Sequence, residues 1–201
     1  HSLSASDARD IRRAVLAWGT KNYQPYPWRN EHGWHGLVAE VLLQRTKAPS
    51  VVPVYEAFTV RFPSPRSLAD ASVEEVISIM YPLGLHWRAI WLRRLGAALD
   101  DCGGQVPNTL DELRSLPGVG PYAAAAWLSF HAGKRGTIVD ANIVRWLCRL
   151  VAQPMDGETR RKKWLISLAD TLTPRRKWRA YNFAALDFSM LVCARHLRLG
   201  V

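Results

Sequence analysis

The stretch LPGVGPYAAAAW, which runs from Leu116 to Trp127, constrains the fold more than any other part of the sequence. Its alanine run strongly favours a helix, and the Gly-Val-Gly turn before it has no Cβ at either glycine to keep a ligand at a distance. The N–H groups of a helix's first turn lack intrahelical partners and can bind an anion such as a phosphate. The same turn would also serve as a plain connection between two helices, and the stretch alone leaves both interpretations open.

The composition favours a nucleic-acid partner over a membrane. The chain of 201 residues has 27 lysines and arginines against 17 aspartates and glutamates, a formal net charge of +10. Such a charge suits binding to a polyanion. No run approaches the length of about eighteen apolar residues that a membrane-spanning helix needs, and the first residues lack the apolar core of a signal peptide.

The cysteines indicate a reducing compartment. Cys102, Cys148 and Cys193 are widely separated and show no metal-ligand spacing. An odd number of such cysteines is typical of reduced thiols rather than of a disulfide framework. We therefore expect the protein in the cytoplasm of a prokaryote, where it would be associated with the nucleoid, or in the nucleus of a eukaryote.

Helical patterns cover nearly the whole chain and predict an all-α fold of about ten short helices. Four of these helices are well delimited: they span about 7–18, 73–80, 86–101 and 110–115. Ser72 and Thr109 each stand three residues before a glutamate, a spacing typical of a helix N-terminus. The pair Gly103-Gly104 marks the end of the third helix.

Two basic clusters, each beside a tryptophan, lie in the second half of the chain. The first is Arg160–Lys163, next to Trp164. The second lies around Trp178 and consists of Arg175, Arg176, Lys177 and Arg179. Each cluster could be a solvated helix face, or the two together could contact phosphates in a salt-dependent way.

Two carboxylates lie in unusual sequence settings. Glu40 is embedded in the apolar stretch GLVAEVLLQRT, where a carboxylate needs a partner or a cleft, and we expect these surroundings to favour its protonated form. Asp140 precedes a predicted helix, where an N-cap role and the helix dipole would both keep it charged. A charged and a protonated acid could stabilise a cationic sugar and donate a proton, respectively, although capping alone also accounts for Asp140.

A set of motifs in a fixed order resembles one known family. LPGVGPY is followed by VDAN at Val139–Asn142. The accompanying motifs are YPWR at Tyr26–Arg29, AEVLLQRT at Ala39–Thr46, GGQVP at Gly103–Pro107 and YNFAALDFSMLVC at Tyr181–Cys193. Together they resemble the helix-hairpin-helix base-excision DNA glycosylases related to endonuclease III. Within that family the chain is most similar to the thymine/uracil mismatch glycosylases, followed by the adenine mismatch glycosylases.

The resemblance implies an all-α enzyme with two helical domains and an active-site cleft between them. A six-helix domain would span 28–133 and contain the helix-hairpin-helix motif. The second domain would combine 1–27 with 134–201.

The resemblance also assigns the central residues of the reaction. Asp140 matches the family's aspartate, which stabilises the oxocarbenium-like sugar or orients the attacking water as the base departs. Asn142 would support the sugar or Asp140. The backbone of the glycine turn, at Gly118, Val119 and Gly120, would hold a phosphate of the DNA.

Residues around the flipped base follow from the same resemblance. Tyr122 stands where strand-cutting relatives carry a lysine, and a tyrosine cannot form the Schiff base that strand cleavage requires. The resemblance therefore implies a monofunctional glycosylase in which the Tyr122 ring contacts the flipped base. Gln44 and Arg45 match residues that fill the gap left by that base and contact the opposite strand, with Arg45 placed to read guanine. Trp28 and Arg29, from the YPWR motif, complete the expected DNA-binding set.

The sequence departs from the family pattern at the positions that would hold a cofactor. Relatives usually carry an iron–sulfur cluster with four cysteine ligands. Cys193 matches the first ligand, but the second is expected near position 200, which is Gly200. We therefore expect no cluster and no metal in this chain, and a monomer that binds duplex DNA containing a mismatched or damaged base.

The leading hypothesis is removal of thymine or uracil mispaired with guanine. The adenine alternative depends on Glu40, which adenine enzymes use to protonate the departing purine, but those enzymes carry a small residue in place of Tyr122. A third hypothesis is a non-catalytic DNA-binding module that uses the glycine turn and the basic clusters.

Overall fold

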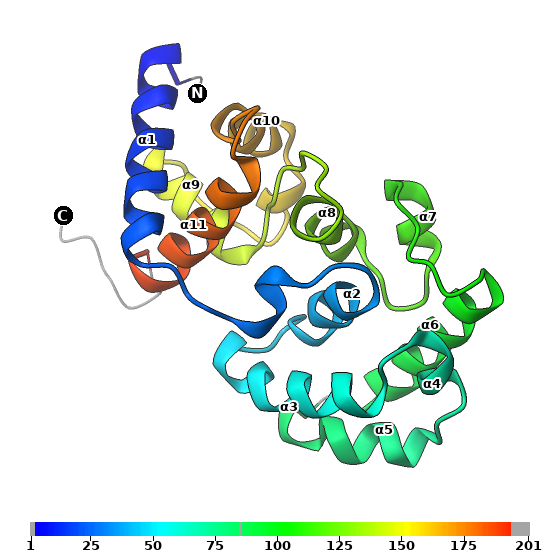
Figure 1. Ribbon diagram of the computed structural model, residues 1–201. Helices are drawn as coiled ribbons and strands as arrows, with labels where there is room; N and C mark the ends of the chain where they lie inside the picture. The colour runs from blue at the N-terminus through cyan, green and yellow to red at the C-terminus, as the bar shows by residue number, and fades with distance from the viewer. Residues whose placement is uncertain (1–2, 85, 194–201) are drawn as a thin grey trace. The chain divides into compact units, whose positions relative to one another are not determined.

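The computed structural model describes residues 3–84 and 86–193, and every regular element among them is a helix (Figure 1). The all-α fold class expected from the sequence is confirmed. The chain divides into two compact units, one formed by Pro25–Lys134 and the other by His1–Gln24 together with Arg135–Val201. None of the helices within the described ranges is long and apolar enough to cross a membrane.

The unit formed by Pro25–Lys134 is built around α2, in which every residue from Gly36 to Leu42 is buried. Its core is a single cluster of aliphatic and aromatic side chains. Its elements are the 3₁₀ helices η1 (Pro27–Asn30) and η2 (Tyr81–Leu83) and the helices α2 (Gly33–Leu42), α3 (Ala48–Arg61), α4 (Pro65–Ala69), α5 (Val73–Met80), α6 (Arg88–Asp101), α7 (Leu110–Ser115) and α8 (Pro121–Phe130). Helix α4 packs on α6, where a Cβ at Gly96 would lie 2.8 Å from the Pro65 backbone oxygen.

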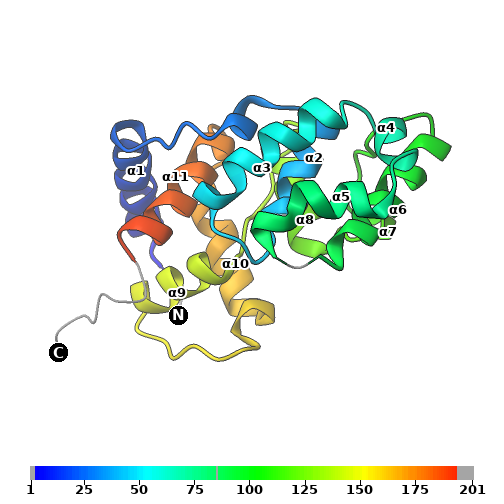
Figure 2. The same cartoon turned by 90° about the horizontal axis from the view of Figure 1, so that it is seen from below.

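The other unit packs α1 along α11, as both views show (Figures 1 and 2). Gly19 permits this approach, because a Cβ there would lie 2.3 Å from the Cβ of Ala184. The elements of this unit are α1 (Ala5–Lys21), α9 (Ala141–Leu150), η3 (Thr159–Arg161), α10 (Lys163–Leu172) and α11 (Trp178–Leu191). They enclose a second apolar core of their own.

The helix ends follow the local signals of the sequence. The side chains of Ser72 and Thr109 each accept a hydrogen bond from the backbone N–H three residues later and so open α5 and α7. At the end of α6, Gly103 and Gly104 have φ angles of +82° and +75°. These left-handed conformations stop the helix at the point that the glycine pair predicts.

Candidate active site

The Gly-Val-Gly turn connects α7 to α8. Gly118 has a φ angle of +76°, which glycine adopts without strain, and Gly120 is the N-cap of α8, where no side chain caps the helix. The Val119 N–H donates to the Leu116 carbonyl at 3.2 Å and closes the turn. In the described part of the chain, neither Gly118 nor Gly120 donates its N–H to a backbone carbonyl.

The DNA contact expected of Val119 stays a prediction, and in the structure this residue is held inside the turn. Its N–H is engaged within the turn, and its side chain is only 5% exposed and belongs to the core of the unit. Val119 therefore anchors the turn, and the glycines on either side offer the N–H groups that a phosphate could approach.

The segment after α2 lies beside this turn. The Gln44 side chain donates from Nε2 to the Gly118 carbonyl oxygen at 3.0 Å. Arg45, which follows, is exposed and has a φ angle of +60°, an unusual backbone conformation for a residue with a side chain. The structure thus brings together two parts of the predicted DNA-binding set that are far apart in the sequence.

Arg88 holds this segment in place, a role that the sequence did not reveal. Its guanidinium donates to the backbone carbonyls of Val41 at 3.4 Å and Leu42 at 3.2 Å, and also to that of Gln44. The residue is 3% exposed, and its burial, together with the charge of Arg45, lowers the pKa of Arg88. A buried cation at the C-terminus of α2 satisfies carbonyls that a helix end leaves without partners.

Arg88→Met is expected to lower the free energy of unfolding by about 3 kcal/mol, because the substitution strands buried carbonyls at the end of α2. Urea denaturation followed by circular dichroism measures this change. Arg93→Met, an exposed site on the same helix, serves as the matched control and should change stability by less than about 0.5 kcal/mol. Equal stability of the two variants would contradict the role assigned to Arg88.

Asp140 is the N-cap of α9, and both of its carboxylate oxygens accept hydrogen bonds. Oδ1 accepts from the Ile143 N–H at 2.7 Å, and Oδ2 accepts from the Asn142 side chain at 2.9 Å. Burial nevertheless raises the pKa of Asp140, because the loss of hydration outweighs these hydrogen bonds. The hydrogen bonds of the cap favour the charged form, as expected from the sequence, and burial opposes them.

Asn142 is itself held by a buried arginine. Arg145, which is 8% exposed, donates to the Asn142 side-chain oxygen at 2.9 Å and to the backbone carbonyls of Ser189 at 3.0 Å and Cys193 at 2.6 Å. The Asp140 carboxylate is therefore oriented through a continuous set of hydrogen bonds that reaches the end of α11.

Cys193, the residue that matches a cluster ligand, is buried next to α9. Its sulfur accepts a hydrogen bond from the Arg149 guanidinium at 3.2 Å. Within residues 3–84 and 86–193, no group of three or more His, Cys, Asp or Glu residues is placed to hold a metal ion. Gly200, at the expected second ligand position, lies outside the described residues.

Glu40 and Tyr122 lie in the unit that contains the glycine turn. Glu40 is 4% exposed, and its Oε1 atom lies 3.1 Å from Nε2 of His131. Tyr122 is the second residue of α8 and is partly buried. The turn of Gly118 and Gly120 therefore leads directly into the helix that carries Tyr122.

Trp28 and Arg29 are each 4% exposed. The Trp28 ring stacks on Tyr26 at a centroid distance of 4.9 Å and meets Tyr55 edge-on at 5.5 Å. The Arg29 guanidinium lies 5.3 Å from the centroid of the Tyr26 ring. Trp28 belongs to the core of its unit and Tyr26 packs against that core, and the DNA contact expected of Trp28 and Arg29 stays a prediction.

The two basic clusters differ in how far they are neutralised. In the first, Lys162 donates to the Asp156 carboxylate at 2.7 Å, and this bond together with the Thr159 hydroxyl lowers the pKa of Asp156 to about 2. In the second, Arg175–Lys177 are exposed, and no carboxylate of the described residues lies within ion-pair distance of them. The second cluster is the better candidate for phosphate contacts.

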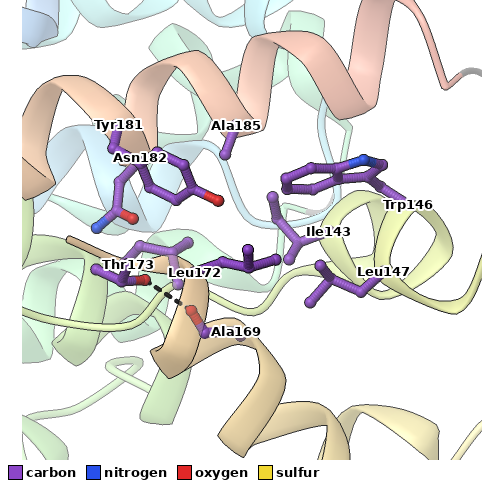
Figure 3. A pocket seen from close by; sticks show the side chains of 10 residues that line it. Ile143, Trp146, Leu147, Ala169, Leu172, Thr173, Tyr181, Asn182 and Ala185 are labelled. Atoms are coloured by element: carbon purple, nitrogen blue, oxygen red, sulfur yellow. Dashed lines mark hydrogen bonds between the residues drawn. The ribbon is translucent and has the colours of Figure 1, made fainter. Parts of the chain in front are cut away.

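A cavity of about 10 Å³ lies in the core of the unit that contains Asp140 (Figure 3). Figure 3 shows Tyr181 and Ala185 of α11 across from Ile143 and Leu147 of α9. The Tyr181 hydroxyl is buried without a hydrogen-bond partner among the described residues, and burial raises its pKa. Because this space holds about one water molecule and no predicted site residue lines it, it is a packing feature rather than a pocket for a base.

Comparison with known proteins identifies the family. Residues 38–167 match the HhH-GPD superfamily of base excision DNA repair proteins. The chain belongs to this superfamily. The matched region contains Glu40, the glycine turn and Asp140, so the resemblance noted from the motifs is confirmed.

The relatives of this HhH-GPD protein include thymine/uracil-DNA glycosylases. That of Pyrobaculum aerophilum is 39% identical over 93% of this chain and 84% of the relative, and that of Methanothermobacter thermautotrophicus is 32% identical over 94% and 89%. The adenine DNA glycosylase of Homo sapiens is 32% identical over 91% of this chain but only 36% of its own length. Among solved structures, a thermostable thymine-DNA glycosylase matches with a TM-score of 0.85 and 30% identity, over 96% of this chain and 90% of that one.

Three residues of the HhH-GPD match were missed by sequence reasoning: Arg88, His131 and Arg145. Each of them has a hydrogen-bond partner far away along the sequence. Arg88 and Leu42 are 46 residues apart, His131 and Glu40 are 91 residues apart, and Arg145 and Ser189 are 44 residues apart. No local pattern of the sequence signals a buried charged group whose partners are so distant.

Proposed function

We propose that this protein is a monofunctional DNA glycosylase that hydrolyses the N-glycosidic bond of thymine or uracil mispaired with guanine. The observation that carries the proposal is the Asp140 carboxylate, fixed at the start of α9 by Ile143 and Asn142. The names of the relatives matched over most of both chains support the same assignment. The protein would act as a monomer on duplex DNA, in the cytoplasm or the nucleus.

The oriented carboxylate suits the chemistry of base release. As the bond between C1′ and N1 breaks, its electron pair leaves with the base and the sugar becomes oxocarbenium-like. The anionic Asp140 stabilises this positive charge and accepts a proton from the water whose oxygen bonds to C1′. The raised pKa of Asp140 makes its carboxylate a stronger base for that proton, which then passes to the released base through solvent.

DNA binding follows from the glycine turn and the segment beside it. The N–H groups of Gly118 and Gly120 would hold a phosphate of the strand that carries the lesion. Gln44 and the exposed Arg45 would face the opposite strand, where an arginine can donate two hydrogen bonds to guanine. The hydrogen bond from Gln44 to Gly118 would link the two contacts.

The identity of Tyr122 supports hydrolysis without strand cleavage. A Schiff base with the sugar requires an amine, which a tyrosine does not have. Tyr122 would instead stack against the flipped base. The absence of a covalent complex after borohydride treatment is the expected result of this assignment.

A panel of labelled duplexes tests the proposal. We expect alkali-labile sites in duplexes with G·T and G·U pairs, and none in the matched A·T and A·U duplexes. An adenine opposite 8-oxoguanine should remain intact. Cleavage at adenine alone would favour the adenine alternative, while tight binding to every duplex without base release would favour a non-catalytic DNA-binding module.

A further inference from the structure

Glu40 and His131 form a buried pair of ionisable side chains at the end of α8, the helix that begins at the glycine turn. Base release through Asp140 assigns no role to this pair. His131 follows the end of α8, and its side chain is fully buried. Its Nε2 atom lies 3.1 Å from Oε1 of Glu40, whose side chain is 5% exposed. Charged side chains with so little exposure are rarely found without a partner.

The second ring nitrogen of His131 fixes the position of one proton. Nδ1 lies 2.7 Å from the backbone carbonyl oxygen of Glu31. A carbonyl oxygen only accepts hydrogen bonds, so Nδ1 must carry the hydrogen. The backbone at His131 is also held, because its carbonyl oxygen lies 2.9 Å from Nδ1 of His32.

Helix α2 has the space that this ring needs. A Cβ at Gly36 would lie 2.5 Å from Cγ and 2.6 Å from Nδ1 of His131, closer than such atoms can approach. Gly36 stands one helical turn before Glu40, so both lie on the same face of α2. The glycine therefore admits the ring that contacts the carboxylate.

The fixed proton on Nδ1 limits what Glu40 can do. One proton lies between Nε2 and Oε1, either on a protonated His131 that faces a carboxylate or on a neutral Glu40 that donates to the ring. In both cases the second oxygen of Glu40, Oε2, carries only lone pairs. The hydrogen bond that the described residues make with the Glu40 side chain is at Oε1, and Oε2 takes part in none.

We propose that His131 is a positioning residue that determines specificity by holding Glu40 as a hydrogen-bond acceptor, so that Oε2 receives the N3–H of a flipped thymine or uracil. This inference rests on the proposed function. Release of adenine is assisted by a proton given to the purine ring, and an oxygen with lone pairs alone cannot give one. The Glu40–His131 pair therefore favours thymine or uracil, whose N3–H can donate to Oε2, over adenine, whose release needs a proton donor.

Two substitutions of His131 distinguish the effect of its N–H donor from the effect of its side-chain volume. The side-chain amide introduced by His131→Gln keeps an N–H that can face Oε1, whereas His131→Leu removes every donor. Single-turnover release of thymine opposite guanine is expected to slow by about 10-fold to 100-fold in His131→Leu and by less than about threefold in His131→Gln. Equal slowing in two variants with wild-type melting temperatures would overturn the proposal.

A double-mutant cycle tests whether His131 acts through Glu40. With Glu40→Gln already present, the further change His131→Leu is expected to slow thymine release by less than about twofold. A purely structural role would make the two effects multiply. Gly36→Ala, which displaces the ring without changing either partner, should slow thymine release as His131→Leu does, and wild-type rates in that variant would count against the proposal.

The spectrum of the ring provides a test that needs no activity. In protein labelled with ¹⁵N-histidine, the His131 signals are assigned by their loss in His131→Gln. We expect a proton-bearing Nδ1, and an Nδ1 without a proton would overturn the inference even if His131→Leu failed to fold. Failure of the wild-type protein to release thymine or uracil would instead overturn the proposed function and leave the ring assignment intact.

Discussion

Replacing Asp140 with asparagine is expected to slow base release by at least about 100-fold while duplex binding stays within about threefold of wild type. The amide cannot stabilise a cationic sugar as a carboxylate does, and it cannot accept a proton from water. Asparagine caps helices as well as aspartate does, so α9 should remain intact. Single-turnover excision and fluorescence anisotropy on a G·T duplex measure the two quantities.

The same substitution should leave stability at neutral pH unchanged or increase it. Because burial raises the pKa of Asp140, the folded state binds more protons than the unfolded state between the ordinary pKa of aspartate and the raised one. The contribution of this group to stability is therefore greatest below that window and falls as the pH rises through it. Because asparagine does not titrate, Asp140→Asn should not lose stability in this way as the pH rises. Urea denaturation at acidic and neutral pH measures the free energy of unfolding of both proteins.

Asp10→Asn provides the matched control for this variant. Asp10 is an exposed carboxylate of the same unit, in a surface pair with Arg13, and its loss should change neither base release nor stability appreciably. Wild-type excision rates in Asp140→Asn would exclude a catalytic role for the carboxylate. A loss of DNA binding in that variant would show that Asp140 contributes to affinity rather than to chemistry.

Gly120→Ala is expected to weaken binding to duplex DNA by about 10-fold with little effect on the fold. No heavy atom of another residue lies within 4 Å of a Cβ built at Gly120, and the φ angle of −82° is an ordinary one. The methyl group therefore has room in the free protein but would obstruct a phosphate that approaches the start of α8. Alanine is a poorer N-cap than glycine but also restricts the unfolded chain, so we expect the free energy of unfolding to change by less than about 1 kcal/mol.

Two other glycines provide the controls. Gly118→Ala places a side chain at φ +76° and 3.4 Å from the Trp91 Cβ, so it should destabilise the protein by about 1–2 kcal/mol as well as weaken binding. A Cβ at Gly157 would also meet nothing within 4 Å, and Gly157→Ala should leave both properties unchanged. Binding measured in the Asp140→Asn background avoids turnover, and wild-type affinity in Gly120→Ala would argue against a phosphate at this turn.

Features that depend on neighbouring residues were determined by the sequence itself. The starts of α5 and α7 follow from Ser72 and Thr109, and the end of α6 follows from Gly103-Gly104, because caps and left-handed glycines act within one helical turn. Apolar residues at helical spacing fixed the all-α class for the same reason. The glycine turn and Asp140 were recognisable because their motifs keep a characteristic order along the chain.

Only the tertiary structure decided what surrounds these residues. Burial raised the pKa of Asp140 in opposition to its hydrogen bonds and placed the Trp28 ring inside a core. It also brought Arg88 to the end of α2 and His131 to Glu40. Hydration and pairing of a charged group depend on packing between segments remote in the chain, so local sequence determines where helices start and stop, while folding alone determines which charges lose water and which partners they gain.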